Sequence, residues 1–501
     1  MICLLPLLWA GPPDEAAARP VQPVLPQPES GLKFLGLVQS RFSITNAITT
    51  NPFLDGQVVG VLGGTNLTES SAEERAVVTE LRTNGFFTYT PKMLDGQASL
   101  TAAFEVDFAY GDQAYQVGGN TGGGFGADQV NLQTRRLHAT FRPRLPAGNA
   151  LTVVAGLQFV SDSVYDPATS RLDDLTRTGG GMRFFGSEAA GLTAYGKLRT
   201  DWGDRLRYKL GAYTLLEKGS SLSDDATLYM VDAQVHPLYA TRIGLHGWYL
   251  RDRTAGTGGL LGAGPTSALS ELQGGPRLDL REAGAVEAPE VNADLFWLGL
   301  DAGYNHRLDR GPLAVGASLV GNLGSLLVVG GKDVGVRGMS ANVNARYKYT
   351  QGDGSLFSFE GLYSSADGTG RDAYTGVLTG NSYGIVGALW TTHGSYLLFP
   401  DGKAINRQVA LAYDLSNQGD GLIALSGSAG YDIIPSRLNL TVGAAHARDA
   451  RANAIGTELN AKVYGRPWTF LELGAVGAMV TGSSFEQQPW TSYAYLEWLV
   501  L

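Results

Sequence analysis

The stretch LTAAFEVDFAY at residues 100–110 alternates between two kinds of side chain. Its even-numbered positions are apolar, and its odd-numbered positions, which include Glu105 and Asp107, are small or charged. A repeat of two residues is that of a β-strand whose faces meet different surroundings. The alternation recurs along most of the chain and is sharpest at residues 339–349. Many such strands with no helix-period segment between them predict an all-β fold, a transmembrane antiparallel β-barrel of about 18 strands, or roughly 16 to 20.

The composition agrees with a barrel. Of the 501 residues, 44% are apolar and 17% are charged, and Gly (68), Tyr (22) and Trp (8) are abundant. Glycine relieves crowding in strands, and Tyr and Trp favour the two membrane interfaces. The net charge of -9 argues against nucleic acid as a partner, because such proteins carry a broad basic surface.

The N-terminal region reads as a targeting segment and a linker. Residues 1–18 contain an apolar run and a small-residue cleavage site at Ala16-Ala17-Ala18, which predict a secretory signal peptide; a buried N-terminal segment is the alternative. Residues 19–31 are Pro-rich and predict an extended periplasmic linker, so the barrel would occupy residues 32–501. Cys3 is the one cysteine, so a processed chain would have neither disulfides nor a cysteine-ligated metal.

The sequence also predicts where the barrel resides. It has no apolar run of about 18 residues, which a membrane-spanning helix needs. A strand-rich chain with an export signal therefore points to the outer membrane of a Gram-negative bacterium, with outer-membrane lipid and the barrel assembly machinery as partners. The last strand alternates Tyr493, Tyr495, Glu497, Leu499 and Leu501, which resembles an assembly signal interrupted by the glutamate.

The connections between expected strands alternate in length. Short turns, such as residues 93–96 and 145–149, separate long Gly/Ser/Asp-rich loops, such as residues 252–290. Barrels of this class have short periplasmic turns and long external loops, so both termini are expected in the periplasm. Residues 405–417 also resemble a strand, but counting it makes the total odd. We therefore assign residues 366–417 to one long external loop that can fold into the lumen.

The face opposite the apolar one would line the lumen, and its side chains would determine which solutes pass. Basic residues outnumber acidic ones in the expected pore-lining set, which comprises Arg136, His138, Arg142, Gln158, Lys197, Arg199, Arg207, Lys209, Arg242, Arg346, Lys348, Glu105 and Asp107. Such a wall favours anions, because arginine binds carboxylates through two parallel hydrogen bonds. The alternative is that these charges pair across strands and only fill the bore.

Part of the chain resembles a known family. The segment from Asn131 to Lys197 contains QTRRL at residues 133–137 and AGLQF at residues 155–159. Together with residues 176–185 and 191–197, it resembles the alginate-export family of outer-membrane barrels. The resemblance implies a monomeric barrel of about 18 strands with a basic bore for an anionic exopolysaccharide.

The resemblance carries over only to candidate wall residues. These are Arg136, Gln158, Lys197 and Arg199. The family has a G-R-Q step before an external loop, whereas here Leu157 stands in the place of its arginine. If the chain does export a polymer, periplasmic export components would be further partners.

Other motifs give no support for enzymatic or cofactor chemistry. The Gly-rich residues 118–124 lack the Lys-Ser/Thr of a phosphate loop. His393 and Ser395 lack an evident third catalytic member, and the histidines have no ligand spacing, so we expect no enzyme, no cofactor and no metal. The sequence thus predicts an outer-membrane channel that passes anionic solutes or exports an anionic exopolysaccharide. The alternative is a plugged surface adhesin or receptor whose external loops bind a partner.

Overall fold

The computed structural model describes most of the chain after residue 30. The described residues are 31–47, 67–70, 75–116, 130–146, 149–161, 186–200, 203–217, 224–238, 240–255, 291–306, 308–350, 352, 354–368, 373–378, 395–399, 419–482 and 487–500. The expected signal peptide and linker, and residues 405–417, lie outside these ranges. No helix in the described ranges is long and apolar enough to cross a membrane.

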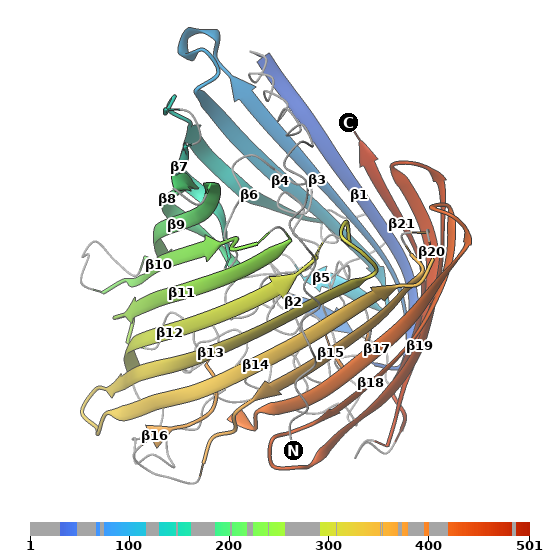
Figure 1. The fold of residues 1–501 in the computed structure, drawn as a ribbon. Helices are drawn as coiled ribbons and strands as arrows, with labels where there is room; N and C mark the ends of the chain where they lie inside the picture. The colour runs from blue at the N-terminus through green and yellow to red at the C-terminus, as the bar shows by residue number, and fades with distance from the viewer. Residues whose placement is uncertain are drawn as a thin grey trace, which may run out of the picture.

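The main sheet closes into a barrel of 18 antiparallel strands, as the alternation predicts. The wall strands are β1 Gly31–Thr45, β3 Ala76–Thr90, β4 Ala98–Gly111, β6 Val130–Phe141, β7 Ala150–Ser161, β8 Gly186–Thr200, β9 Gly203–Leu216, β10 Ala226–Val235, β11 Thr241–Asp252, β12 Val291–Tyr304, β13 Leu313–Val328, β14 Val334–Lys348, β15 Leu356–Ser364, β17 Leu422–Ile434, β18 Leu438–Arg448, β19 Ala454–Trp468, β20 Leu471–Thr481 and β21 Trp490–Val500. They follow one another round the ring in chain order (Figure 1). The last strand pairs with the first, with Leu37 opposite Leu499, so the described wall has no open edge.

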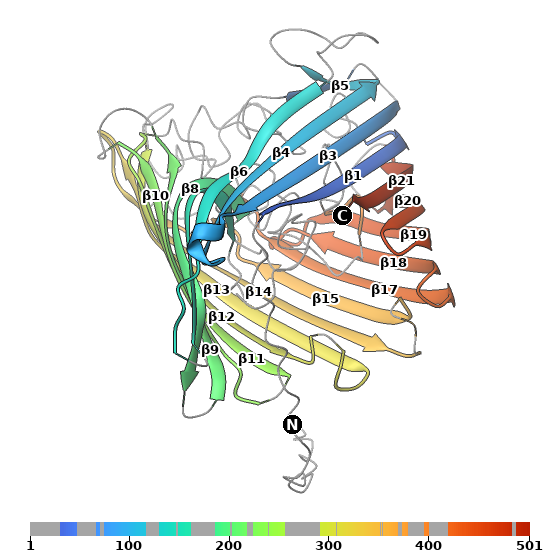
Figure 2. The same cartoon turned by 90° about the horizontal axis from the view of Figure 1, so that it is seen from above.

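Short elements accompany the wall. Strands β2 (Leu67–Ser70) and β5 (Gln113–Gln116) pair with each other as a separate ribbon. Strand β16 (Ala373–Tyr374) pairs in parallel with β14, and the 3-10 helix η2 (Lys92–Leu94) forms part of a turn. The second view shows β9–β13 on the opposite side of the ring from β1 and β21 (Figure 2).

The two ends of the barrel differ in their connections. One end, here the turn end, has connections such as residues 91–97 and 435–437, where Asp95 and Ser436 adopt positive φ angles of 46° and 59°. The other end, here the loop end, has connections such as residues 253–290 and 365–421. Strands β15 and β17 pair directly, so the connection of 365–421 supplies no wall strand between them. As expected, the wall therefore contains no additional strand between β15 and β17.

The two faces of each strand meet different environments. In β4, the side chain of Leu100 on the outer face is 58% exposed, whereas Ala103 and Glu105 on the inner face are buried. Large apolar side chains are exposed on the outer face of strand after strand round the ring. An outward apolar band with a polar interior is what a barrel in lipid requires. The protein is therefore a membrane-spanning barrel of the outer-membrane type.

The final strand departs from its expected orientation. Tyr493 is buried and Tyr495 donates a hydrogen bond to the inner-face Glu472 at 2.7 Å, so both tyrosines point into the barrel. The outer face carries Leu496 and Trp498 instead. The assembly-signal pattern was thus assigned to the wrong parity. Glu497 consequently interrupts no lipid-facing row.

Adjacent substitutions in β14 test the two faces. Val343 is 51% exposed on the outer face, whereas Asn344 on the inner face donates a hydrogen bond to Asn342 at 3.1 Å. We expect Val343→Arg to destabilise the barrel by about 2 to 4 kcal/mol, because the cation would face lipid. Asn344→Arg should leave a folded barrel. The shift in electrophoretic mobility between folded and heat-unfolded protein measures both; equal folding of the two variants would contradict this face assignment.

Candidate functional site: the barrel lumen

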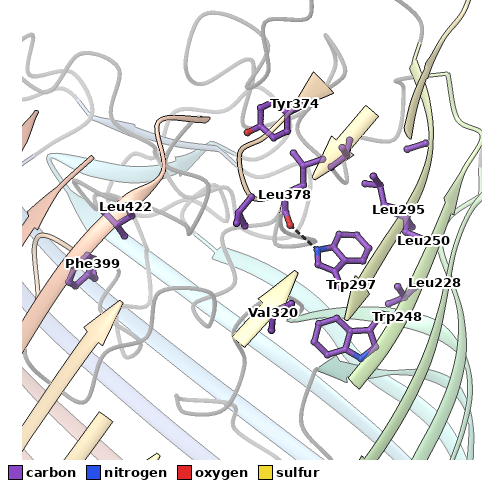
Figure 3. Packing of buried hydrophobic residues seen from close by; sticks show 14 of the residues in the cluster. Leu228, Trp248, Leu250, Leu295, Trp297, Val320, Tyr374, Leu378, Phe399 and Leu422 are labelled. Atoms are coloured by element: carbon purple, nitrogen blue, oxygen red, sulfur yellow. Dashed lines mark hydrogen bonds between the residues drawn. The ribbon is translucent and has the colours of Figure 1, made fainter. Parts of the chain in front are cut away.

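The inner wall is apolar towards the loop end. On β10 to β12 the inward side chains there are Leu228, Met230, Leu250, Leu295 and Trp297, and all are at most 2% exposed. They belong to one buried cluster that reaches Leu422 across the lumen (Figure 3). Alternation predicts a polar inner face along whole strands, and this part of the lumen departs from that prediction. The apolar inner side chains are buried because segments of the 365–421 connection pack against them.

Residues 373–378 form the first inner segment of this connection. The Nε1–H of Trp297 donates to the carbonyl oxygen of Leu378 at 2.8 Å, as the dashed line in Figure 3 shows. The N–H of Leu378 donates to the side chain of Asn322 at 3.4 Å. Gly338 lies beneath this segment, and a methyl group there would collide with the carbonyl oxygen of Gly376. The wall thus provides both hydrogen-bond partners and space for the backbone of the segment.

Residues 395–399 form the second inner segment, and Glu458 of β19 holds it. One carboxylate oxygen accepts hydrogen bonds from the Ser395 hydroxyl at 2.7 Å and from the N–H groups of Leu397 and Leu398 at 2.8 Å. The other accepts from the N–H of Tyr396 at 2.7 Å and from the Asn460 side chain at 2.8 Å. Glu458 is fully buried, so these donors replace the water that an ionised carboxylate needs.

The contacts of Ser395 also show what this residue of the His393/Ser395 pair does in the structure. Ser395 donates its hydroxyl proton to Glu458 and accepts from the N–H of Phe399 at 3.2 Å, so its contacts hold the inner segment in place. His393 lies outside the described residues. Among those residues, no group of three or more His, Cys, Asp or Glu side chains could hold a metal ion.

A second region of the inner wall carries a buried ionic network across four neighbouring strands. Asp232 of β10 stands directly opposite Lys209 of β9 and His246 of β11. Its carboxylate lies 2.9 Å from the Lys209 ammonium and 2.6 Å from His246 Nδ1, and it accepts from Trp248 Nε1 at 2.9 Å.

The network continues to β12. His246 Nε2 lies 2.8 Å from Asp301, which also pairs with Arg242 at 3.5 Å. Carboxylates can only accept hydrogen bonds, so both ring nitrogens of His246 donate and the imidazole is cationic. Three cations and two carboxylates leave this ionic network with one net positive charge.

A third region, on β3 to β6, contains a β-bulge that changes which arginines face inward. The register between β4 and β6 shifts by one residue here: Ala103 lies opposite Arg136, whereas the next residue, Phe104, lies opposite Thr134. As a result both Arg135 and Arg136 reach the lumen: Arg135 lies 3.7 Å from Glu105, and Arg136 lies over the ring of Phe86 at 5.4 Å. Strict alternation places Arg135 in lipid, so it was not among the predicted pore-lining residues. The bulge is the physical reason.

The predicted pore-lining residues fall into several environments. Glu105 pairs with Arg82 at 3.4 Å, and His138 Nδ1 lies 3.2 Å from the carbonyl of Leu157. Gln158 donates to the carbonyl of Gly191 at 3.0 Å. Lys197 and Arg207 stand opposite each other on β8 and β9.

The other predicted residues lie near the turn end or in the network. Arg142 follows β6, Arg199 is exposed near the end of β8, and Arg346 donates to the carbonyl of His306. Lys348 ends β14, while Lys209 and Arg242 belong to the buried ionic network. The side chain of Asp107 lies outside the described part of the structure.

The inner basic residues of β1 and β19 were not among the predicted pore-lining residues. Glu472 accepts from Arg466 at 2.8 Å and from Lys462 at 3.4 Å, and Arg41 lies over the ring of Tyr493 at 3.5 Å. Arg41, Lys462 and Arg466 share the inner parity of their strands and were available to the same argument.

Comparison with known proteins gives structural similarity only. No protein-family model and no curated protein sequence matches the chain. Solved structures with a similar outline include OccAB4 of Acinetobacter baumannii, at 9% identity and a TM-score of 0.45 over 95% of this chain and 99% of that one. A BenF-like porin from Pseudomonas fluorescens Pf-5 has 12% identity and a TM-score of 0.46 over 94% and 98% of the two chains. At such values the function has to follow from this chain's own residues.

Proposed function

We propose that this protein is an outer-membrane channel that passes small anionic solutes, with its loop end outside the cell and its turn end in the periplasm. The orientation follows from the short periplasmic turns and long external loops typical of such barrels. The proposal rests chiefly on the inner face of β6–β9, here the basic sector. Its described inward Lys, Arg and His residues are Arg135, Arg136, His138, Lys197, Arg199, Arg207 and Lys209.

The basic sector suits conduction of anions. No carboxylate stands on its described inner face. On the adjoining strands, Glu105 of β4 pairs with Arg135 and Asp232 of β10 pairs with Lys209, so Arg136, Lys197, Arg199 and Arg207 make the local field positive although the whole chain carries -9. Lys197 and Arg207 are adjacent in register, and charges on neighbouring strands lie within about one Debye length of ~8 Å at physiological salt. Several weak binding sites, one after another along the wall, let an anion enter and leave, which a channel requires.

The 365–421 connection limits the size of solute that can pass. Its described segments occupy the lumen at the loop end, where they contact Trp297 and Glu458. This favours small solutes over a polymer. Export of an anionic exopolysaccharide would require the inner segments to move aside, and flux of a uronate monomer against a uronate oligomer separates the two substrate classes.

A plugged receptor is the second candidate function. The observation that favours it is the buried apolar cluster formed by the wall and the inner segments. A plugged barrel would show no steady conductance in a planar bilayer, whereas a channel would conduct.

Removing charge from the basic sector tests the main proposal. We expect Arg136, Arg199 and Arg207 replaced together by Gln to shift the reversal potential in a salt gradient towards cation selectivity, because three positive charges leave one wall. Arg144→Gln is the matched control, since Arg144 is exposed beyond β6 and pairs with Asp95 at 3.4 Å. A wild-type channel that is neutral or cation-selective would exclude anion passage through this wall.

A further inference from the structure

In the described part of the wall, the charged side chains on the outer surface lie near one end of the barrel. Among the described side chains of the wall strands, the Asp, Glu, Lys, Arg and His residues on the lipid-facing parity all lie near the loop end. They are Arg251, Asp294, Arg337, His446 and Arg448. Three arginines therefore stand against one aspartate. A lipid-facing charge is tolerated near the interface and costly at the membrane centre, so these residues mark the headgroup level of that leaflet.

The surroundings of Arg251 are ordered. Arg253 holds Asp294 through two hydrogen bonds from Nη2, at 2.9 and 2.7 Å, and Tyr249 donates its hydroxyl to the same carboxylate at 2.7 Å. Asp294 stands directly opposite Arg251 in the strand register, but its lone pairs serve Arg253 and Tyr249. Two arginines and one aspartate leave a positive charge here. The Arg251 guanidinium forms no hydrogen bond or ion pair within the described part of the chain.

An aromatic platform lies next to this charge, on the side of the membrane centre. Tyr249 stacks on Phe296 with centroids 4.5 Å apart and on Tyr229 with centroids 6.0 Å apart. The rings of Tyr229 and Phe296 are about half exposed on the outer face. Aromatic rings at the membrane interface contact headgroups and upper acyl chains. A ligand that touches both the platform and Arg251 must therefore sit in the membrane.

We propose that this outer rim binds the phosphate groups of a phosphorylated glycolipid in the outer leaflet, with Arg251 as the primary contact and Arg337 and Arg448 as further contacts round the barrel. Arginine suits phosphate because its fork donates two parallel hydrogen bonds. The aromatic platform selects a lipid rather than a free anion. The inference rests on the orientation given above, which places the loop end outside the cell.

Lipid binding by the purified full-length chain tests the rim. The probes are diphosphorylated lipid A, the same lipid with its phosphates removed, and inorganic phosphate, each added to protein in neutral detergent and followed by native mass spectrometry. We expect Arg251→Gln to weaken lipid A binding about fivefold and the combined Arg251, Arg337 and Arg448 to Gln variant at least tenfold, given the effect of one arginine at an anionic surface. Arg144→Gln, at the turn end, should bind as the wild type does.

Each arm of this experiment can overturn the inference. Equal binding of lipid A with and without phosphates by the wild-type protein would do so without any variant. Equal binding of lipid A by the wild type and the triple variant would also contradict the inference. Displacement of lipid A by inorganic phosphate at the same concentration would contradict it as well. Ion selectivity is measured separately in neutral bilayers, so failure of the rim site leaves the anion channel to be judged on its own result.

Discussion

Glu458→Ala is expected to raise single-channel conductance several-fold, because it releases residues 395–399 from the inner wall. The carboxylate accepts one hydroxyl and three backbone N–H groups of this segment. Each buried donor left without an acceptor costs about 1 to 3 kcal/mol. Four such donors cost about 4 to 12 kcal/mol. This offsets the gain from packing Leu397, Leu398 and Phe399 into the apolar cluster, so we expect the segment to leave the lumen for much of the time.

Glu458→Gln and Glu360→Gln complete this experiment. A glutamine at 458 keeps one acceptor oxygen but presents an NH2 group to the remaining donors, so an intermediate conductance is expected. Glu360 is a buried inner-wall carboxylate that accepts a hydrogen bond from Asn342 of the wall, and its replacement leaves the bonds between Glu458 and residues 395–399 in place. Its variant should conduct as the wild type does. Unchanged conductance in Glu458→Ala would show that residues 395–399 do not restrict the pathway.

Much of the barrel could be predicted because lipid imposes a simple rule on every strand. One face must be apolar and the other polar, so Leu100 and Val343 identify the outer face from local sequence alone. The same rule located short turns at the residues that adopt positive φ, such as Asp95. The requirement for an even number of strands, and not the alternation, excluded a wall strand between β15 and β17.

The rule fails where the lumen is not wet or a strand is irregular. At residues 295–298 of β12 and 228–231 of β10 both faces are apolar, since the inner face packs against a distant segment of the chain. Loss of alternation is the signal that could have revealed this burial. The bulge beside Arg135 has no comparable signal, because it depends on register between two strands. The role of Glu458 likewise depends on where a loop far along the chain folds back.

The buried ionic network gives the largest expected change in stability. Asp232→Ala should destabilise the barrel by about 3 to 5 kcal/mol, because it leaves the Lys209 ammonium buried without its carboxylate. The side chains of Lys209 and Asp232 are 1% and 0% exposed, so water cannot replace the lost partner. His246 and Trp248 lose an acceptor in the same substitution. The measurement is the midpoint of urea unfolding, followed by electrophoretic mobility.

Removing the cation as well separates the charge effect from a loss of packing. We expect Lys209→Met combined with Asp232→Ala to recover part of the stability lost by Asp232→Ala alone, because no uncompensated ammonium then remains inside the wall. His246 retains its bond to Asp301 in the double variant, which limits the remaining damage. If the double variant is no more stable than Asp232→Ala, the loss arises from His246 and Trp248, and the Lys209–Asp232 pair is not what stabilises the contact between β9 and β10.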